Sequence, residues 1–150
     1  MRVRDIMKKD VYTISPQATL KEAIEKLYEL KVSGLIVANE KNEVVGILSE
    51  KDVYRAFYPS YEDFYNSPEL FTDYKKQEAE IKNKTNVLVQ EVMTQKVIKI
   101  DPDEYIMKVG SIMLSRNIHR LPVVNKNGKL VGVISRGCIY RSLFRKQLGF

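Results

Sequence analysis

Ser49 and Asp52 have the side-chain types and the spacing to bind a vicinal diol. They follow the apolar run 44–48 and open a predicted helix, where free backbone N–H groups and the helix dipole favour polar ligands. A carboxylate there can accept hydrogen bonds from two adjacent hydroxyl groups, and such charge-assisted bonds select the diol geometry. The same pair is also an ordinary helix cap, which stabilises by about 1 kcal/mol. From these residues alone, both interpretations stay open.

His119 and Arg120 stand immediately before a second apolar run, 121–124. An arginine suits phosphate because its planar guanidinium donates two parallel hydrogen bonds. The histidine has an ordinary pKa of about 6.5 and is largely neutral at pH 7, so it is either a ligand contact or a structural residue. Of the two residues, Arg120 is the better suited to an anion.

Catalysis has little support in the sequence. One His and one Cys cannot supply a four-ligand zinc site, and the chain has neither a phosphate-binding glycine-rich loop nor a Gly-x-Ser-x-Gly turn. The acidic residues Asp101, Asp103 and Glu104 precede a predicted helix, where acids complement the dipole, so we interpret them as caps. We expect no catalytic residue and no bound metal.

The composition is that of a soluble globular protein, with 150 residues, 44% hydrophobic and 29% charged. No run of 18 apolar residues and no secretory segment is present, and the single Cys138 cannot form an internal disulfide. We therefore expect a cytoplasmic protein without membrane association. The net charge of +6 divides into +1 for residues 1–57, −2 for 58–88 and +7 for 89–150. The basic excess either attracts phosphates or is ordinary solvated surface.

An internal repeat organises the chain. Displacing the sequence by 86 positions aligns two copies without a gap. The identical pairs include Val3 with Val89, Met7 with Met93, Val11 with Val97, Ile14 with Ile100, Pro16 with Pro102, Leu35 with Leu121, Val37 with Val123, Gly46 with Gly132, Ser49 with Ser135, Tyr54 with Tyr140 and Arg55 with Arg141. We predict repeat 1 over residues 1–57, an aromatic-rich insert over 58–88 and repeat 2 over 89–150.

The sequence pattern within each copy predicts the element order β-α-β-β-α. Together the two copies predict an α+β fold in which they are related by pseudo-twofold symmetry. The first copy begins with a strand over 11–14, followed by a helix that Thr19 and Glu22 open with a capping box. Two apolar runs then predict an antiparallel hairpin, for which Asn127-Gly128 in copy two indicates a type I′ turn. The last helix is predicted to start after an N-cap serine in each copy. In the first helix of each copy the apolar residues fall at helical spacing: Leu20, Ala23, Ile24, Leu27, Tyr28 and Leu30 in copy one, and Ile106, Val109, Met113 and Leu114 in copy two. The last helix is predicted to carry Val53, Tyr54 and Phe57 inward in copy one, and Ile139, Tyr140, Leu143 and Phe144 in copy two.

The insert concentrates aromatic residues between the two copies. The spacing of Phe57, Tyr61, Phe64 and Tyr65 predicts a short helix with one aromatic face, and 75–82 predicts a polar helix or loop. We expect this segment to cover an edge of the module or to form a partner surface.

Four stretches of this sequence resemble the tandem cystathionine-beta-synthase-type domain pair, also called the CBS pair or Bateman module. The carriers of the resemblance are Val3-Arg4-Asp5-Ile6-Met7, Gly46-Ile47-Leu48-Ser49-Glu50-Lys51-Asp52, Val89-Gln90-Glu91-Val92-Met93 and Asn117-Ile118-His119-Arg120-Leu121-Pro122-Val123-Val124. Each string is weak evidence alone, but they occur in register at one constant offset. The insert is longer than the usual connection of this family.

The resemblance implies a nucleotide pocket to which both copies contribute. It assigns the ribose to Ser49 and Asp52, adenine to Val97 and Ile98, and the phosphates to Arg120 with His119 and Lys51. In copy two, Ser135 is followed at the aspartate position by Cys138, whose thiol cannot replace a carboxylate on a diol. We therefore expect one competent pocket and one degenerate pocket.

The function implied is a non-catalytic regulatory module that binds AMP, ADP or ATP, with S-adenosylmethionine as another adenosine ligand. The resemblance also implies a homodimer and a separate regulated protein, which the sequence does not identify. One alternative is a structural or oligomerisation module with vestigial pockets. Another is a nucleic-acid-binding accessory protein, which is disfavoured because no helix-turn-helix, zinc-finger or aromatic RNA-binding signature accompanies the basic residues.

Overall fold

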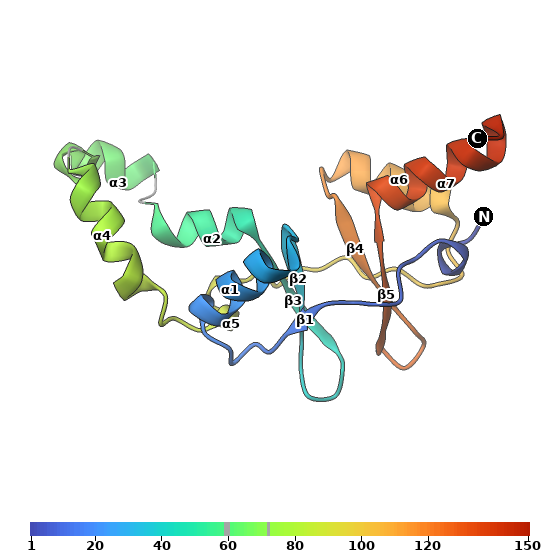
Figure 1. Cartoon of the computed structure of the whole chain (residues 1–150), viewed down its shortest axis with the longest axis horizontal. Helices are drawn as coiled ribbons and strands as arrows, with labels where there is room; N and C mark the ends of the chain where they lie inside the picture. The colour runs from blue at the N-terminus through green and yellow to red at the C-terminus, as the bar shows by residue number, and fades with distance from the viewer. Residues whose placement is uncertain (59–60, 72) are drawn as a thin grey trace. The chain divides into compact units, whose positions relative to one another are not determined.

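The computed structural model describes residues 1–58, 61–71 and 73–150 and has the predicted mixed α+β architecture, with two β-α-β-β-α repeats (Figure 1). The first repeat contains the 3-10 helix η1 (Val3–Asp5), β1 (Thr13–Ile14), α1 (Leu20–Leu30), β2 (Gly34–Ala38), β3 (Val44–Ser49) and α2 (Glu50–Phe57). The insert contains α3 (Tyr61–Asn66), η2 (Pro68–Phe71) and α4 (Tyr74–Lys84). The second repeat contains α5 (Val89–Val92), α6 (Ile106–Ser115), β4 (Arg120–Val124), β5 (Leu130–Ser135) and α7 (Arg136–Leu148).

The strands form two small sheets. In the first, the strand order is β1-β2-β3, and β1 runs parallel to β2 with Thr13 opposite Ile36. In the second, β4 and β5 are antiparallel as predicted, with Arg120 opposite Ser135. The initial strand of each copy is shorter than predicted: β1 has two residues, and in copy two only Ile100 forms a bridge, to Val123.

The hairpin turn in copy two differs from the prediction. A type I′ turn needs positive φ at both central residues, but Gly128 has φ +76° while Asn127 does not adopt positive φ. The N–H of Gly128 donates to the carbonyl of Asn125 (3.0 Å), and the Asn125 side chain accepts from the N–H of Lys129 (3.0 Å). The connection is therefore a type I turn followed by a left-handed residue. Copy one repeats this geometry, with Asn42 (φ +59°) in the left-handed position.

The predicted helix starts are confirmed. Thr19 Oγ1 accepts from the N–H of Glu22 (3.2 Å), and the Glu22 carboxylate accepts from the N–H of Thr19 (2.8 Å). The Ser49 and Ser135 hydroxyls accept from the backbone N–H three residues later in α2 and α7. Each hydroxyl satisfies a backbone donor that has no partner within its helix.

The chain divides into two compact units whose limits differ from those of the sequence repeats. Unit 1 contains residues 1–12, 38–44 and 96–150, and unit 2 contains residues 13–37 and 45–95. The buried core of unit 1 consists of Val3, Ile100, Ile106, Val109, Met113, Leu121, Val123, Ile134, Cys138 and Ile139. The buried core of unit 2 consists of Ile14, Leu20, Ala23, Leu27, Leu35, Val37, Leu48 and Val89.

The opening segment of each repeat pairs with the last strand of the other repeat. In unit 1, Lys8 and Val133 exchange two backbone hydrogen bonds of 2.9 Å. In unit 2, Ile47 and Thr94 do the same at 2.9 and 3.0 Å. Close approach requires a glycine in each strand: a Cβ at Gly132 would lie 2.9 Å from the Lys8 carbonyl oxygen, and the neighbouring methionine would be closer still.

Several predicted inward-facing residues are exposed in the structure. The exposed fractions are 61% for Tyr54 and 65% for Tyr140. Phe144 is 41% exposed. The prediction is wrong for these residues because helical periodicity identifies an apolar face without showing how far the chain itself covers it.

The insert is helical rather than a flexible linker. The short helix predicted from the aromatic spacing is confirmed as α3, and the polar segment 75–82 lies within α4. Pro59 lies outside the described residues, as do the side chains of Tyr61 and Phe64 on which the predicted aromatic face depends. Among the described residues, no helix combines the length and apolar character needed to cross a bilayer.

Replacing Gly132 by Ala should destabilise the protein by about 1–3 kcal/mol, since the new methyl group must displace the backbone of Lys8 or the Met7 side chain. Gly110→Ala is the matched control, because Gly110 lies inside α6 and its Cβ would meet Ile139 at 4.0 Å, an ordinary contact. That variant should gain about 0.5–1 kcal/mol through reduced freedom of the unfolded chain. Urea unfolding of both variants measures the two effects, and equal stabilities would contradict the proposed close approach.

Candidate functional site

The Ser49–Asp52 pair forms a hydrogen-bonded box at the start of α2. One carboxylate oxygen of Asp52, Oδ2, accepts from the Ser49 N–H (2.9 Å) and from the Ser49 hydroxyl (3.0 Å). The Asp52 residue is only 4% exposed and is the one buried charged residue of the described core. The position predicted for a diol-binding carboxylate therefore holds an acid inside the protein, at a helix start.

Two further side chains reach the other oxygen, Oδ1. The Thr94 hydroxyl donates to it at 2.9 Å, and the Arg55 guanidinium donates at 3.1 Å. All four acceptor directions of the carboxylate are thus occupied by protein donors. Neither Arg55 nor Thr94 was predicted from the sequence as a partner of Asp52. Arg55 lies three positions after Asp52, which could have indicated it, whereas Thr94 is 42 positions away.

Beside Asp52, the surface has a hollow of about 210 Å³. It is lined by Asp52, Arg55, Ala56, Glu91 and Val92. The third predicted residue of this unit, Lys51, is exposed on α2. The Asp52 carboxylate and its Arg55 partner therefore border a space open to a ligand.

Copy two repeats the box with sulfur in place of the carboxylate. Ser135 Oγ accepts from the Cys138 N–H (3.2 Å) and donates to the Cys138 Sγ (3.1 Å). The cap is preserved while the charge is lost, because Cys138 is a buried, free thiol. That this second pocket is degenerate stays a prediction.

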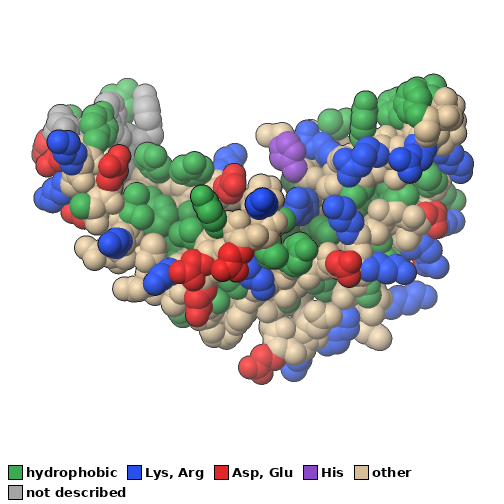
Figure 2. Space-filling model, in the orientation of Figure 1, with side chains coloured by type: hydrophobic (Ala, Val, Ile, Leu, Met, Phe, Trp, Pro, Cys, Tyr) green, Lys and Arg blue, Asp and Glu red, His purple; other side chains and the backbone are tan. Residues whose placement is uncertain are grey.

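His119 and Arg120 lie at the beginning of β4 in unit 1. His119 is exposed and Arg120 is half-buried, and Arg120 stands opposite Ser135 in the strand ladder. An unpredicted residue, Arg136, contacts this region: its Nη2 lies 3.0 Å from the His119 Nε2, and its Nε donates to the Ile118 carbonyl at 3.0 Å. Figure 2 shows the histidine on the viewed face.

Val97 and Ile98 are half-buried in the segment that leads to Ile100. They are not in a strand, which corrects the predicted first strand of copy two. Ile98 packs against the unit 1 core. The predicted site residues thus divide between units: Ser49, Lys51 and Asp52 belong to unit 2, and the other four to unit 1. Their convergence on one ligand stays a prediction.

The acidic residues before α6 have structural partners. Asp103 forms an ion pair with Arg4, and Glu104 pairs with Lys108 at 2.7 Å. The hydrogen bond from Lys108, followed by that from the Tyr105 N–H, holds the pKa of Glu104 below its ordinary value. Their interpretation as helix caps is wrong in detail, because α6 has no side-chain N-cap. In residues 1–58, 61–71 and 73–150, no cluster of His, Cys, Asp or Glu is arranged to hold a metal ion.

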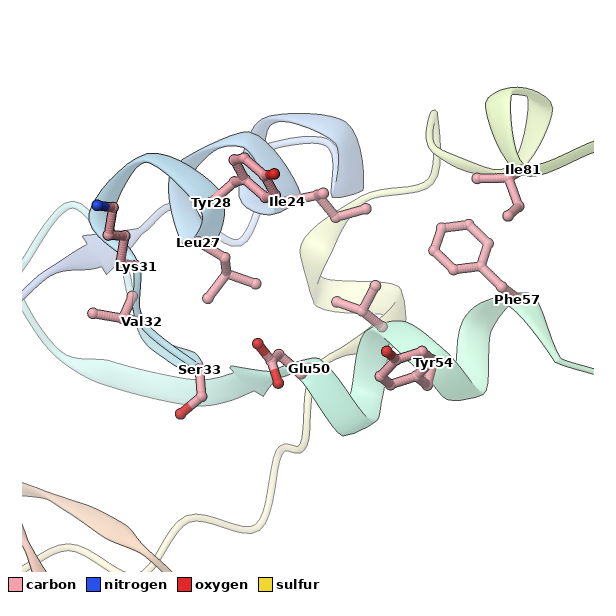
Figure 3. A pocket seen from close by; sticks show the side chains of 11 residues that line it. Ile24, Leu27, Tyr28, Lys31, Val32, Ser33, Glu50, Tyr54, Phe57 and Ile81 are labelled. Carbon is pink, nitrogen blue, oxygen red and sulfur yellow. The ribbon is translucent and has the colours of Figure 1, made fainter. Parts of the chain in front are cut away.

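Unit 2 also contains an apolar cavity of about 790 Å³ between α1, α2 and α4. Figure 3 shows Leu27 and Ile24 of α1, Phe57 of α2 and Ile81 of α4 around it, with Glu50 and Ser33 toward one end. None of the predicted site residues lines this cavity. The cavity is therefore distinct from the surroundings of Asp52.

Comparison with known proteins identifies related sequences and folds. The sequence profile of the CBS domain matches residues 3–59 and 89–145. Protein MJ1426 of Methanocaldococcus jannaschii is 34% identical over 155 residues, which cover 95% of this chain and 91% of that protein. The chain spans only 58% and 60% of two other curated relatives.

Two solved structures share the fold over nearly their whole length. The structure of CBSX2 of Arabidopsis thaliana in complex with AMP has a TM-score of 0.76 at 24% identity, covering 97% of this chain and 98% of that one. The CBS domain pair of protein MJ0100, in complex with 5′-methylthioadenosine and S-adenosylmethionine, has a TM-score of 0.73 at 24% identity and covers 98% of each chain. At this identity, the likeness shows the fold.

Replacing Thr94 by Val should lower the free energy of unfolding by about 1–2 kcal/mol, because the hydroxyl bond to a buried carboxylate is lost. Thr94→Ser, which retains the hydroxyl, should lose less. The double-mutant cycle of Thr94→Val with Asp52→Asn, measured by urea unfolding, should give a coupling energy of at least about 0.5 kcal/mol. Additive effects of the two changes would show that this contact has no energetic role.

Proposed function

Because the chain belongs to the CBS domain family and carries two copies of that domain, we propose that it is a regulatory module that binds an adenosine nucleotide. The observation that carries the proposal is the buried carboxylate of Asp52 at the start of α2. An ordinary N-cap can remain at the surface, whereas burying a charge costs free energy unless several donors compensate for it. A buried carboxylate beside a hollow is suited to a ligand that brings its own hydroxyl donors.

The proposed ribose contact is an exchange of hydrogen-bond donors on one oxygen. The two Ser49 bonds to Oδ2 fix the orientation of the carboxylate. The Arg55 side chain, which donates to Oδ1, is 67% exposed, so breaking this bond costs little free energy. The 2′- and 3′-hydroxyl groups of a ribose then replace Arg55 and Thr94 on Oδ1. The helix cap remains in place throughout.

The remaining contacts of the ligand are assigned by the family resemblance. Val97 and Ile98 would pack against adenine, and Arg120, His119 and Lys51 would bind phosphate. That CBSX2 binds AMP, and MJ0100 binds two other adenosine compounds, supports adenosine as the common part of the ligand. AMP, ADP and ATP are the proposed ligands, which would make the protein an energy sensor.

The regulatory output would be a change in packing or in binding to a separate protein. A ligand shifts such an equilibrium only by its differential affinity for the two states. The proposal assigns the chain no catalytic role. The single cysteine fits a reducing compartment such as the cytoplasm.

A homodimer is the proposed assembly. Tyr28 and Tyr54 of the first repeat, and Tyr58 directly after it, are exposed apolar residues that correspond, at the repeat offset, to Leu114, Tyr140 and Phe144 of the second repeat. Tyr54 and Tyr58 form a ring pair at 6.0 Å between centroids, and Tyr140 and Phe144 form one at 5.0 Å. Exposed aromatic residues at matched positions favour an interface between copies of the chain.

The alternative is an interaction module with vestigial pockets. The same exposed aromatic residues support it, because an interface does not require a ligand. Nucleotide binding distinguishes the two functions.

Adenosine nucleotides should stabilise the wild-type protein in a thermal-unfolding assay. At 100 times the dissociation constant, a ligand adds about 2.7 kcal/mol, and each kcal/mol raises the Tm by roughly 2–4 °C for a chain of this size. The shift should vanish in Asp52→Ala and in Asp52→Asn, which preserves the shape of the side chain. Asp73→Asn is the matched control, because Asp73 caps α4 away from the predicted site and its loss should leave the shift intact. No shift with any adenosine compound in the wild type would favour the interaction module.

Charged residues introduced at the matched aromatic positions should dissociate the dimer. Analytical ultracentrifugation of Tyr54→Glu combined with Tyr140→Glu should give a monomer where the wild type gives a dimer. Tyr74→Glu, at a 66% exposed position on α4, is the control. A monomeric wild type, or a double variant that still dimerises, would contradict this assembly.

A further inference from the structure

Arg136 holds a fixed position in unit 1 through the three residues that precede β4. Its Nε donates to the Ile118 carbonyl (3.0 Å), and its Nη2 lies 3.3 Å from Asn117 Oδ1 and 3.0 Å from His119 Nε2. The N–H of Arg136 also donates to the His119 carbonyl (3.0 Å). The guanidinium is therefore held at both its Nε and its Nη2 atoms.

These bonds leave two donors of Arg136 unused. A guanidinium has five N–H donors, and the contacts above use one on Nε and two on Nη2. The two hydrogens of Nη1 have no partner among the described residues. Since the loss of side-chain freedom has already occurred in the folded chain, these donors can bind an anion at little further entropic cost.

The contact also fixes which group His119 offers to a ligand. An arginine can only donate, so Nε2 of the neutral His119 is an acceptor and its proton is on Nδ1. Beside it, the side chain of the half-buried Arg120 makes no hydrogen bond with the described part of the chain. In the same part of the chain, no Asp or Glu forms an ion pair with Arg120 or Arg136. The cluster of His119, Arg120 and Arg136 is thus rich in donors and not neutralised by any acid.

The geometry points to Arg136 as a specificity-determining residue that makes this cluster select an adenosine bearing a 5′-phosphate over one bearing sulfur at that position. The inference rests on the proposed nucleotide-binding function. A phosphate supplies the anionic acceptors that two guanidinium groups require. The sulfonium of S-adenosylmethionine carries a positive charge at the same position, and the thioether of 5′-methylthioadenosine is an uncharged, weak acceptor.

The internal repeat provides a comparison for this role. The residue of the first copy at the position of Arg136 is Glu50, and the residue at the position of His119 is Ser33. The backbone contact is the same in both copies, because the N–H of Glu50 donates to the Ser33 carbonyl at 3.0 Å. The shared backbone geometry thus carries a cationic cluster in copy two and none at the corresponding residues of copy one.

The test is isothermal titration calorimetry of the full chain with AMP, S-adenosylmethionine and 5′-methylthioadenosine. The wild type should bind AMP at least tenfold more tightly than either sulfur compound. Arg136→Met should weaken AMP binding about 10- to 100-fold, the range expected for a hydrogen bond to a charged group, and leave 5′-methylthioadenosine binding within twofold. Arg136→Lys keeps the positive charge but loses the planar guanidinium, so its affinity for AMP should lie between those of the wild type and Arg136→Met. Arg141→Met, the same change five residues further along α7, is the matched control and should bind like the wild type.

Each alternative outcome decides between the inference and the proposed function. A wild type that prefers either sulfur compound, or an Arg136→Met variant that keeps the AMP preference, overturns the inference and leaves nucleotide binding in place. A wild type that binds none of the three compounds, and neither ADP nor ATP, overturns the proposed function. Thermal stabilisation by pyrophosphate then decides the inference: a shift in the wild type that Arg136→Met loses supports the anion cluster, and no shift overturns it.

Discussion

The structure depends on the pairing of each repeat's opening segment with the last strand of the other repeat. Two reciprocal pairs of backbone hydrogen bonds, at Lys8 with Val133 and at Ile47 with Thr94, make this exchange. The exchange is sterically permitted only because the strand residue facing each segment is a glycine. Consequently neither repeat, taken as a stretch of sequence, contains all the residues of one compact unit. The same pairing places Thr94 beside α2, where its hydroxyl donates a hydrogen bond to the carboxylate of Asp52.

A symmetric scaffold carries an asymmetric set of functional groups. The serine cap, the strand glycine and the type I turn recur in both copies, since they satisfy backbone groups that any copy of the fold must satisfy. Side chains beyond these backbone requirements diverge, and the charge at the third helical position is the clearest instance, with a carboxylate at Asp52 and a thiol at Cys138. The repeat thus separates the residues that the fold requires from those that are free to acquire chemistry.

Local features of the sequence were sufficient for most of the fold and for part of the site. The capping pairs, the strand hairpin of copy two and the helices follow from interactions within a few residues, and each was predicted. The type I′ turn was wrong because the dipeptide alone does not reveal that the Asn125 side chain supports a different turn. The contacts of Thr94 with Asp52 and of Arg136 with His119 span 42 and 17 positions. They result from tertiary packing, which no spacing rule along one helix or strand encodes.

The interleaved composition of the units also orders their completion during synthesis. Every residue of unit 2 precedes position 96, so this unit can close while the rest of the chain is still being made. Residues 1–12 are synthesised before unit 2, but their strand partner near Val133 is made more than a hundred residues later. Closing unit 1 therefore requires a loop of more than a hundred residues, a long-range contact that forms slowly. The apolar residues Val3 and Met7 of this segment therefore remain exposed until the second repeat has been synthesised and packs against them.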